Sequence, residues 1–145
     1  LEESRRAAGR HSPTDAVIAR AEADALTLAF PGATAPAPAE LIETLHLPDM
    51  NDRHVLAAAI SGDADEILTL NTKDFPSNVL ASHGILRRHP DEFLLEAYYS
   101  DQAMMREVVE DALDQAASLG ISVTNRRGVL KRSKLPRLAK AFTQS

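Results

Sequence analysis

The sequence predicts an α/β fold in which helices flank a parallel sheet. Short apolar runs that suit strands, at 66–70 and 84–88, alternate with segments that suit helices. Aspartate and asparagine residues also gather where a strand ends and where a helix begins, as they do at the sites of open α/β sheets. Two strands are too few for such a sheet. We therefore expect the missing strands to lie before Leu1, which is not an initiator residue.

Each element of the first half is predicted by its end signals. Pro13 follows a capping serine, and Asp49 suits the cap of a helix that Gly62 ends, with Asp52 in its first turn. The elements expected are a helix end over 1–9, a helix from Pro13 to Phe30, an extended connection over 31–38, a short helix over 39–45 and the helix from Asp49 to Gly62.

The second half is predicted in the same way. The elements expected are a strand over 66–70, a short helix over 77–82, a strand over 84–88, a helix over 90–100, a long helix capped by Ser100 and ended by Gly120, and a last helix from Pro136 to Phe142. One face of the long helix is apolar, and we expect its two methionines to fill the core. That face comprises Met104, Met105, Val108, Val109, Ala112, Leu113 and Ala116.

Composition excludes several classes of function. A chain of 145 residues with 44% hydrophobic and 26% charged residues matches a globular domain of ordinary size. The absence of cysteine excludes disulfides, zinc–thiolate sites and thiol catalysis. No apolar run is long enough to span a bilayer and no signal peptide is visible, so we expect no membrane association. The lack of cysteine suits a cytoplasmic location, which we expect. Few aromatic residues and no tryptophan argue against a base-stacking platform.

Charge is distributed unevenly along the chain. The net charge is −5, but residues 121–145 hold seven basic residues and no acidic one, so residues 1–120 carry −12. This basic tail is expected to contact phosphates or an acidic partner through Arg126, Arg127, Lys131 and Arg132, and to take no part in the fold. A merely solvated tail is the alternative.

Three polar residues are placed to share a metal ion. Asn71 and Asp74 follow the strand over 66–70, and Asp52 begins the helix that feeds this strand. A helix antiparallel to the following strand begins near that strand's carboxyl end, so the three side chains are expected to converge there. Mg²⁺ and Mn²⁺ prefer such oxygen ligands. Caps and turns are the alternative explanation, and Arg53 and His54 are expected to hold the helix start.

The stretches "DRHVLAAAISGDADEILTLNTKDFP", "HGI" and "PDEFL" resemble the PIN-domain family, the Mg²⁺/Mn²⁺-dependent ribonucleases that include VapC-type toxins. The resemblance implies a PIN-like three-layer fold with a central parallel sheet. Residues 1–95 would form that domain without its first strand, and residues 96–145 an extension made of an amphipathic helix and the basic tail.

The resemblance also implies roles for individual residues. Glu3, with Glu2 as the fallback, matches a glutamate that the family places on a helix beside the site. Glu3, Asp52 and Asp74 would be catalytic, and all three with Asn71 would bind the metal. The family's first strand carries a central aspartate that this chain lacks, so the 145 residues alone are expected to have little nuclease activity.

The function implied is hydrolysis of RNA phosphodiesters by the toxin of a toxin–antitoxin pair, with RNA and an antitoxin as partners. One alternative is a non-catalytic PIN-like module that binds protein or RNA. Another is a split enzyme whose first strand comes from a separate chain. Family analogy also suggests a homodimer, with the face of Met104 and Val108 as its interface.

Overall fold

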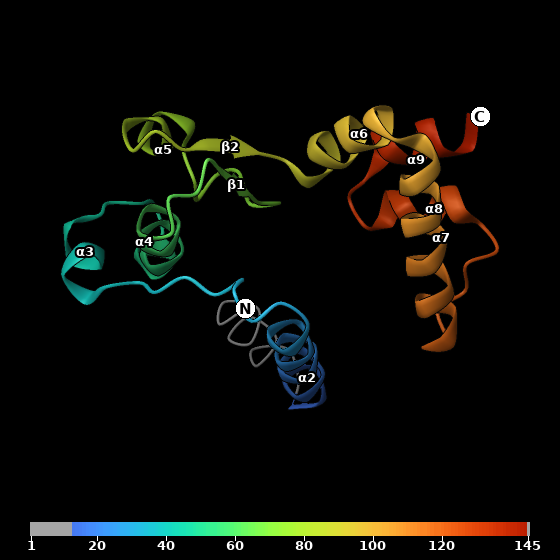
Figure 1. Ribbon diagram of the computed structural model, residues 1–145, viewed down its shortest axis with the longest axis horizontal. Coiled ribbons are helices and arrows are strands. Elements are labelled where there is room, and N and C mark those ends of the chain that lie inside the picture. Colours follow the sequence, from blue (N-terminus) through green and yellow to red (C-terminus); the bar gives the residue numbers. More distant parts are fainter. Residues whose placement is uncertain (1–12, 145) are drawn as a thin grey trace. The chain divides into compact units, whose positions relative to one another are not determined.

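The computed structural model of the protein describes residues 13–144 (Figure 1). The chain divides into two compact units, Leu1–Ala64 and Asp65–Ser145. The helix end expected over 1–9, and Glu3 within it, lies outside the described residues. Among residues 13–144, no helix combines the length and the apolar character needed to cross a membrane. The domain boundary expected at residue 95 stays a prediction.

Three helices form the described part of the first unit, and their bounds confirm the expected elements. Helix α2 spans Pro13–Ala29, α3 spans Ala39–Thr44 and α4 spans Arg53–Ser61, with a single 3-10 turn, η1, over Met50–Asp52. Helices α3 and α4 contact each other, and Leu56 and Ala57 of α4 are fully buried. Gly62 ends α4, and a Cβ there would lie 3.0 Å from the Ala35 Cβ, so a larger residue would require Ala35 to shift by a few tenths of an ångström.

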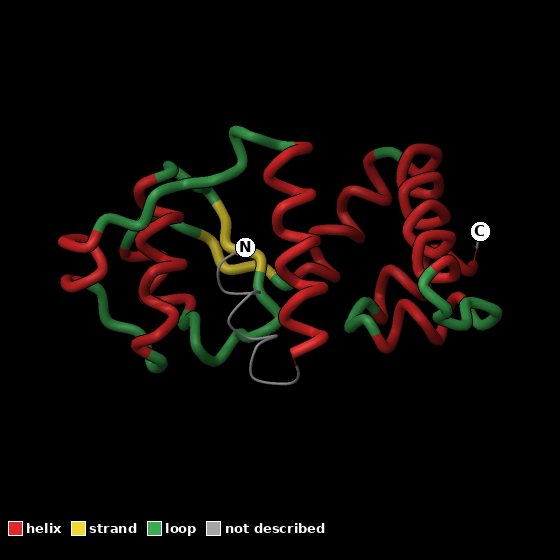
Figure 2. Tube along the Cα trace, turned by 90° about the horizontal axis from the view of Figure 1, so that it is seen from below, coloured by secondary structure: helices red, strands yellow, loops and turns green. Residues whose placement is uncertain are grey.

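The second unit begins with a small parallel sheet. Strand β1 spans Glu66–Leu68 and β2 spans Leu86–Arg88, with Ile67 opposite Arg87, and helix α5 (Ser77–Ser82) connects them. Figure 2 shows the two strands running side by side. The parallel pairing is as expected and is compatible with an α/β fold. The three-layer arrangement stays a prediction, because residues 13–144 contain two strands and are otherwise mostly helical.

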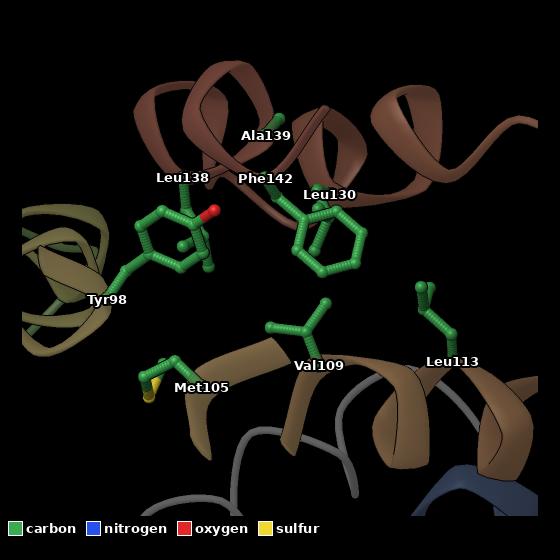
Figure 3. Close-up of a cluster of buried hydrophobic side chains, with 8 residues drawn as sticks. All are labelled: Tyr98, Met105, Val109, Leu113, Leu130, Leu138, Ala139 and Phe142. Carbon is green, nitrogen blue, oxygen red and sulfur yellow. The ribbon is translucent and has the colours of Figure 1, made fainter. Parts of the chain in front are cut away.

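Four helices complete the second unit. They are α6 (Pro90–Ser100), α7 (Gln102–Ser118), α8 (Arg126–Arg132) and α9 (Pro136–Gln144). They bury a common apolar cluster, drawn in Figure 3, which consists of Tyr98, Met105, Val109, Leu113, Leu130, Leu138, Ala139 and Phe142. The expectation that the basic tail takes no part in the fold is therefore wrong. Four of these eight residues lie in α8 and α9, so the tail supplies half of the cluster.

Two details of α7 also differ from expectation. Asp101, not Ser100, caps the helix: its carboxylate accepts a hydrogen bond from the Met104 N–H at 3.0 Å, whereas Ser100 ends α6. The methionines do not both fill the core, because Met105 is buried and Met104 is 52% exposed. The apolar face is thus narrower than the sequence suggested, and Met105, Val109 and Leu113 form its buried part.

A buried carboxylate joins the first and last helices of this cluster. Asp91, in the first turn of α6, is 3% exposed. Its two oxygens accept hydrogen bonds from the Arg137 N–H at 2.9 Å and the Leu138 N–H at 3.0 Å, at the start of α9. These N–H groups have no partner within their own helix, and the negative charge suits the helix N-terminus. Asp91 therefore caps a helix that begins 45 residues later in the chain.

Replacement of Asp91 by alanine should destabilise the second unit. Asp91→Ala removes both acceptors and leaves buried N–H groups unpaired, which should lower the free energy of unfolding by about 2–3 kcal/mol. Asp91→Asn keeps one acceptor and should cost less. Urea denaturation measures both. The control is Glu92→Ala, which breaks only the exposed pair with Arg137 and should cost under about 1 kcal/mol. Equal effects at residues 91 and 92 would contradict the capping role.

Candidate metal centre

Two carboxylates lie together at the start of α4. Asp49 caps the turn η1, and its side chain accepts a hydrogen bond from the Asn51 N–H at 2.9 Å. The Asp52 N–H donates to the Asp49 carbonyl oxygen at 3.1 Å, which brings the two side chains to one side of the turn. Carboxylate oxygens of Asp49 and Asp52 lie within 4.8 Å of each other, and Asp52 is buried. A divalent cation would offset the repulsion between two such charges.

The neighbouring side chains hold this helix start, as the sequence predicted. The Arg53 guanidinium donates to the Met50 carbonyl oxygen at 3.0 Å and to the Ile42 carbonyl oxygen at 3.3 Å. The His54 Nδ1 lies 2.7 Å from the Asn51 carbonyl oxygen, so Nδ1 carries the proton and donates it. Both residues thus fix backbone carbonyl groups of the turn that leads into Asp52.

The second unit presents its own pair of oxygen donors after β1. The Asn71 amide nitrogen donates a hydrogen bond to the Asp74 carboxylate, and the Asn71 N–H donates to the Thr69 hydroxyl at 3.0 Å. Asn71 is exposed and Asp74 is half-buried. These contacts confirm that Asn71 and Asp74 lie together in the turn beyond the strand. A turn of this kind can be purely structural, but its donor set is also one that Mg²⁺ and Mn²⁺ accept.

Arg87 of β2 fixes the shape of this turn. Its guanidinium donates to the carbonyl oxygens of Thr72 at 2.9 Å and Phe75 at 3.2 Å, on either side of Asp74. This role was not predicted from the sequence. The only sequence signal was the pair of arginines in a short strand. Their position in the strand does not indicate which groups such long side chains contact.

The next arginine of β2 forms an ion-pair network at the strand end. Arg88 pairs with Glu66 of β1 at 3.2 Å and with Glu96 of α6. The hydrogen bond that the Arg88 guanidinium donates to the Glu96 carboxylate is the main cause that raises the pKa of Arg88 above its ordinary value, and Glu66 adds to it. Arg88 therefore keeps its positive charge at every pH at which the protein is folded.

Each unit contributes one local group of candidate ligands. Asp49 lies with Asp52 in the first unit, and Asn71 lies with Asp74 in the second. Convergence of Asp52 with Asp74 stays a prediction, and so does the role of Glu3. Asp49 is an additional candidate ligand. Only a capping role was predicted for it from the sequence, although the spacing Asp-x-x-Asp at a helix start was a usable signal.

The expected contact residues of the basic tail all lie on α8. Arg126, Arg127, Lys131 and Arg132 are exposed. The tail has no acidic residue of its own, but the structure supplies acids from other helices: Arg126 pairs with Glu110 of α7, and Arg137 of α9 pairs with Glu92 of α6 at 3.3 Å.

Comparison with known proteins gives one partial similarity. No profile of a protein family matches the chain, and no solved structure is significantly similar to it. A stretch of 45 residues, 31% of the chain, is 51% identical to the Mycobacterium tuberculosis (strain ATCC 25618 / H37Rv) protein named "Putative ribonuclease VapC50". The match covers 27% of that protein, so the chain spans about a quarter of this curated relative. Over this stretch the chain is therefore similar to part of a protein that is named as a VapC ribonuclease.

The role of Arg87 is open to a direct test. Arg87→Met keeps an apolar stem but removes two charge-assisted hydrogen bonds, which should lower the free energy of unfolding by about 1–3 kcal/mol. It should also increase amide hydrogen exchange in the turn over 71–75. The control is Lys73→Met, at an exposed position of the same turn. Unchanged exchange in Arg87→Met would show that the turn holds its shape without Arg87.

Proposed function

We propose that this chain is part of a divalent-metal-dependent ribonuclease that hydrolyses RNA phosphodiesters and acts as the toxin of a toxin–antitoxin pair. The observation that carries the proposal is the 45-residue stretch that is 51% identical to a protein named as a VapC ribonuclease. The oxygen-donor groups at the start of α4 and after β1 agree with it. RNA is the substrate and a cognate antitoxin is the protein partner under this proposal.

The metal ligands proposed are Glu3, Asp52, Asn71 and Asp74, with Asp49 added from the structure. The donor set fits Mg²⁺ or Mn²⁺, because all of these groups offer oxygen atoms and neither local group contains a nitrogen or sulfur ligand. When bound, such an ion makes a water molecule more acidic and stabilises charge on the leaving oxygen. Asp52 and Asp74 would hold the ion, and Asn71 would orient the Asp74 carboxylate through their hydrogen bond.

The surrounding residues position these groups. Arg53 and His54 hold the turn that carries Asp52, and Arg87 holds the turn that carries Asp74. None of the three is assigned to proton transfer.

The proposal is tested with the protein encoded by the complete reading frame that contains these 145 residues. Asp52→Asn and Asp74→Asn should each weaken Mn²⁺ binding, measured by calorimetry, by more than the roughly 10- to 100-fold that loss of a residue beside the ligands costs. Both should abolish Mn²⁺-dependent cleavage of single-stranded RNA. Asp111→Asn, the same change on an exposed site of α7, is the matched control and should have no effect.

The alternatives predict other results. A binding module without catalytic activity would bind RNA or a partner protein without Mn²⁺-dependent cleavage. A split enzyme would cleave RNA only after addition of a second chain that carries the first strand. Unaltered Mn²⁺ binding in both aspartate variants would contradict the ligand set.

Asp49 allows the capping and metal-binding roles to be separated. Asparagine caps helices as well as aspartate, so Asp49→Asn should change the free energy of unfolding by less than about 0.5 kcal/mol, whereas Asp49→Ala should cost about 1 kcal/mol. Both variants should weaken Mn²⁺ binding if the carboxylate is a ligand. Normal Mn²⁺ affinity in Asp49→Asn would show that Asp49 is a cap only.

A further inference from the structure

Ion pairing divides the basic residues of the C-terminal helices into two groups. Arg126 and Arg137 are each paired with an acid of α7 or α6. The other five have no ion-pair partner in the part of the chain that the structure describes, and all five are exposed: Arg127, Lys131, Arg132, Lys134 and Lys140. Net charge along the sequence could not make this division, since the paired acids lie in other helices.

Three of the five unpaired cations share one face of α8. Leu130 is buried in the cluster and Val129 packs against it, so these two residues define the inner side of the helix. At 3.6 residues per turn, Arg127, Lys131 and Arg132 occupy an arc of about 140° on the opposite side. We call Arg127, Lys131 and Arg132 the α8 basic face.

A glycine lies within that arc. Gly128 falls between the three cations on the helix surface, and the Asn125 carboxamide oxygen, which caps α8, accepts a hydrogen bond from its N–H at 2.8 Å. A Cβ at this position would lie 2.8 Å from the Asn125 side chain, so a larger residue would collide with the cap. The Asn125 carboxamide thus fills the space beside Gly128, and the three cations are the charged side chains of this arc.

We infer that the α8 basic face binds the phosphate backbone of single-stranded RNA and adds affinity outside the metal centre. This inference rests on the proposed function, which makes RNA the substrate. Residues 121–135 contain no aromatic side chain on which a base could stack, so the contact is to phosphates and is independent of base sequence. Each phosphate bound by a single strand should add about −0.7 to the slope of log affinity against log salt concentration.

The test uses the protein from the complete reading frame, with its binding to a labelled 20-nucleotide polyuridine measured in EDTA over a salt series. The variant Arg127→Gln/Lys131→Gln should reduce the salt slope by about 1.4 and weaken binding roughly 10-fold or more at 0.1 M salt. The control Lys134→Gln/Lys140→Gln removes the same charge from exposed cations outside the α8 basic face and should leave the slope nearly unchanged. A second variant, Arg127→Lys/Lys131→Arg, keeps both charges and should retain binding.

Three results would overturn the inference. Equal losses in the two glutamine variants would show a diffuse effect of net charge, and unchanged affinity in Arg127→Gln/Lys131→Gln would show that RNA binds elsewhere. Equal or tighter binding of duplex DNA would remove the assignment to RNA.

The EDTA condition separates this inference from the proposed function. If Mn²⁺-dependent cleavage occurs while the glutamine variants bind normally, only the α8 basic face is refuted. If RNA binds through Arg127 and Lys131 but no cleavage or Mn²⁺ binding is found, only the proposed ribonuclease is refuted.

Discussion

The C-terminal half of the molecule depends on one buried carboxylate. Asp91 accepts hydrogen bonds from the first N–H groups of α9, and α9 in turn brings Leu138, Ala139 and Phe142 into the apolar cluster. Arg106 of α7 adds a second link, because its guanidinium donates to the Phe142 carbonyl oxygen at 3.3 Å and lies 5.1 Å from the centroid of the Phe142 ring. Helices that are short by themselves are thereby held in one arrangement, since isolated helices of this length are unstable in water.

This arrangement also explains how one segment can be both basic and structural. The apolar residues of α8 and α9 recur at helical spacing and point into the cluster, while the cations occupy the outer sides. Exposed charges contribute little to folding, so the composition of the outer side is free to serve binding. The inner side of each helix provides stability and the outer side is available for binding. Folding and binding therefore depend on different residues of the same helices.

Sequence reasoning succeeded where the signal is local. Helix ends are marked by the conformational preferences of single residues, and the structure places helix boundaries close to Pro13, Asp49, Pro90 and Gly120.

Prediction from the sequence failed where the interacting partner is distant along the chain. Nothing near Asp91 in the sequence indicates that it caps a helix 45 residues on, and nothing near Arg87 indicates two carbonyl groups after the preceding strand. Helix α8 was missed because its seven residues were read for their charge, although Asn125 was a visible cap. For the candidate site, sequence identified Asp52, Asn71 and Asp74, while the capping role concealed Asp49 as a further candidate ligand.

The hydrogen bonds from Arg87 to the turn after β1 determine which positions of that turn can be substituted. Arg87 contacts carbonyl oxygens, which every residue possesses, and so it does not depend on which side chains stand at positions 72 and 73. Those positions can change without moving the backbone that carries Asp74. Point substitutions can thus alter the surface around Asp74 while Asp74 itself stays in place. Substitutions at positions 72 and 73 can therefore change what this surface binds without changing the position of the Asp74 carboxylate.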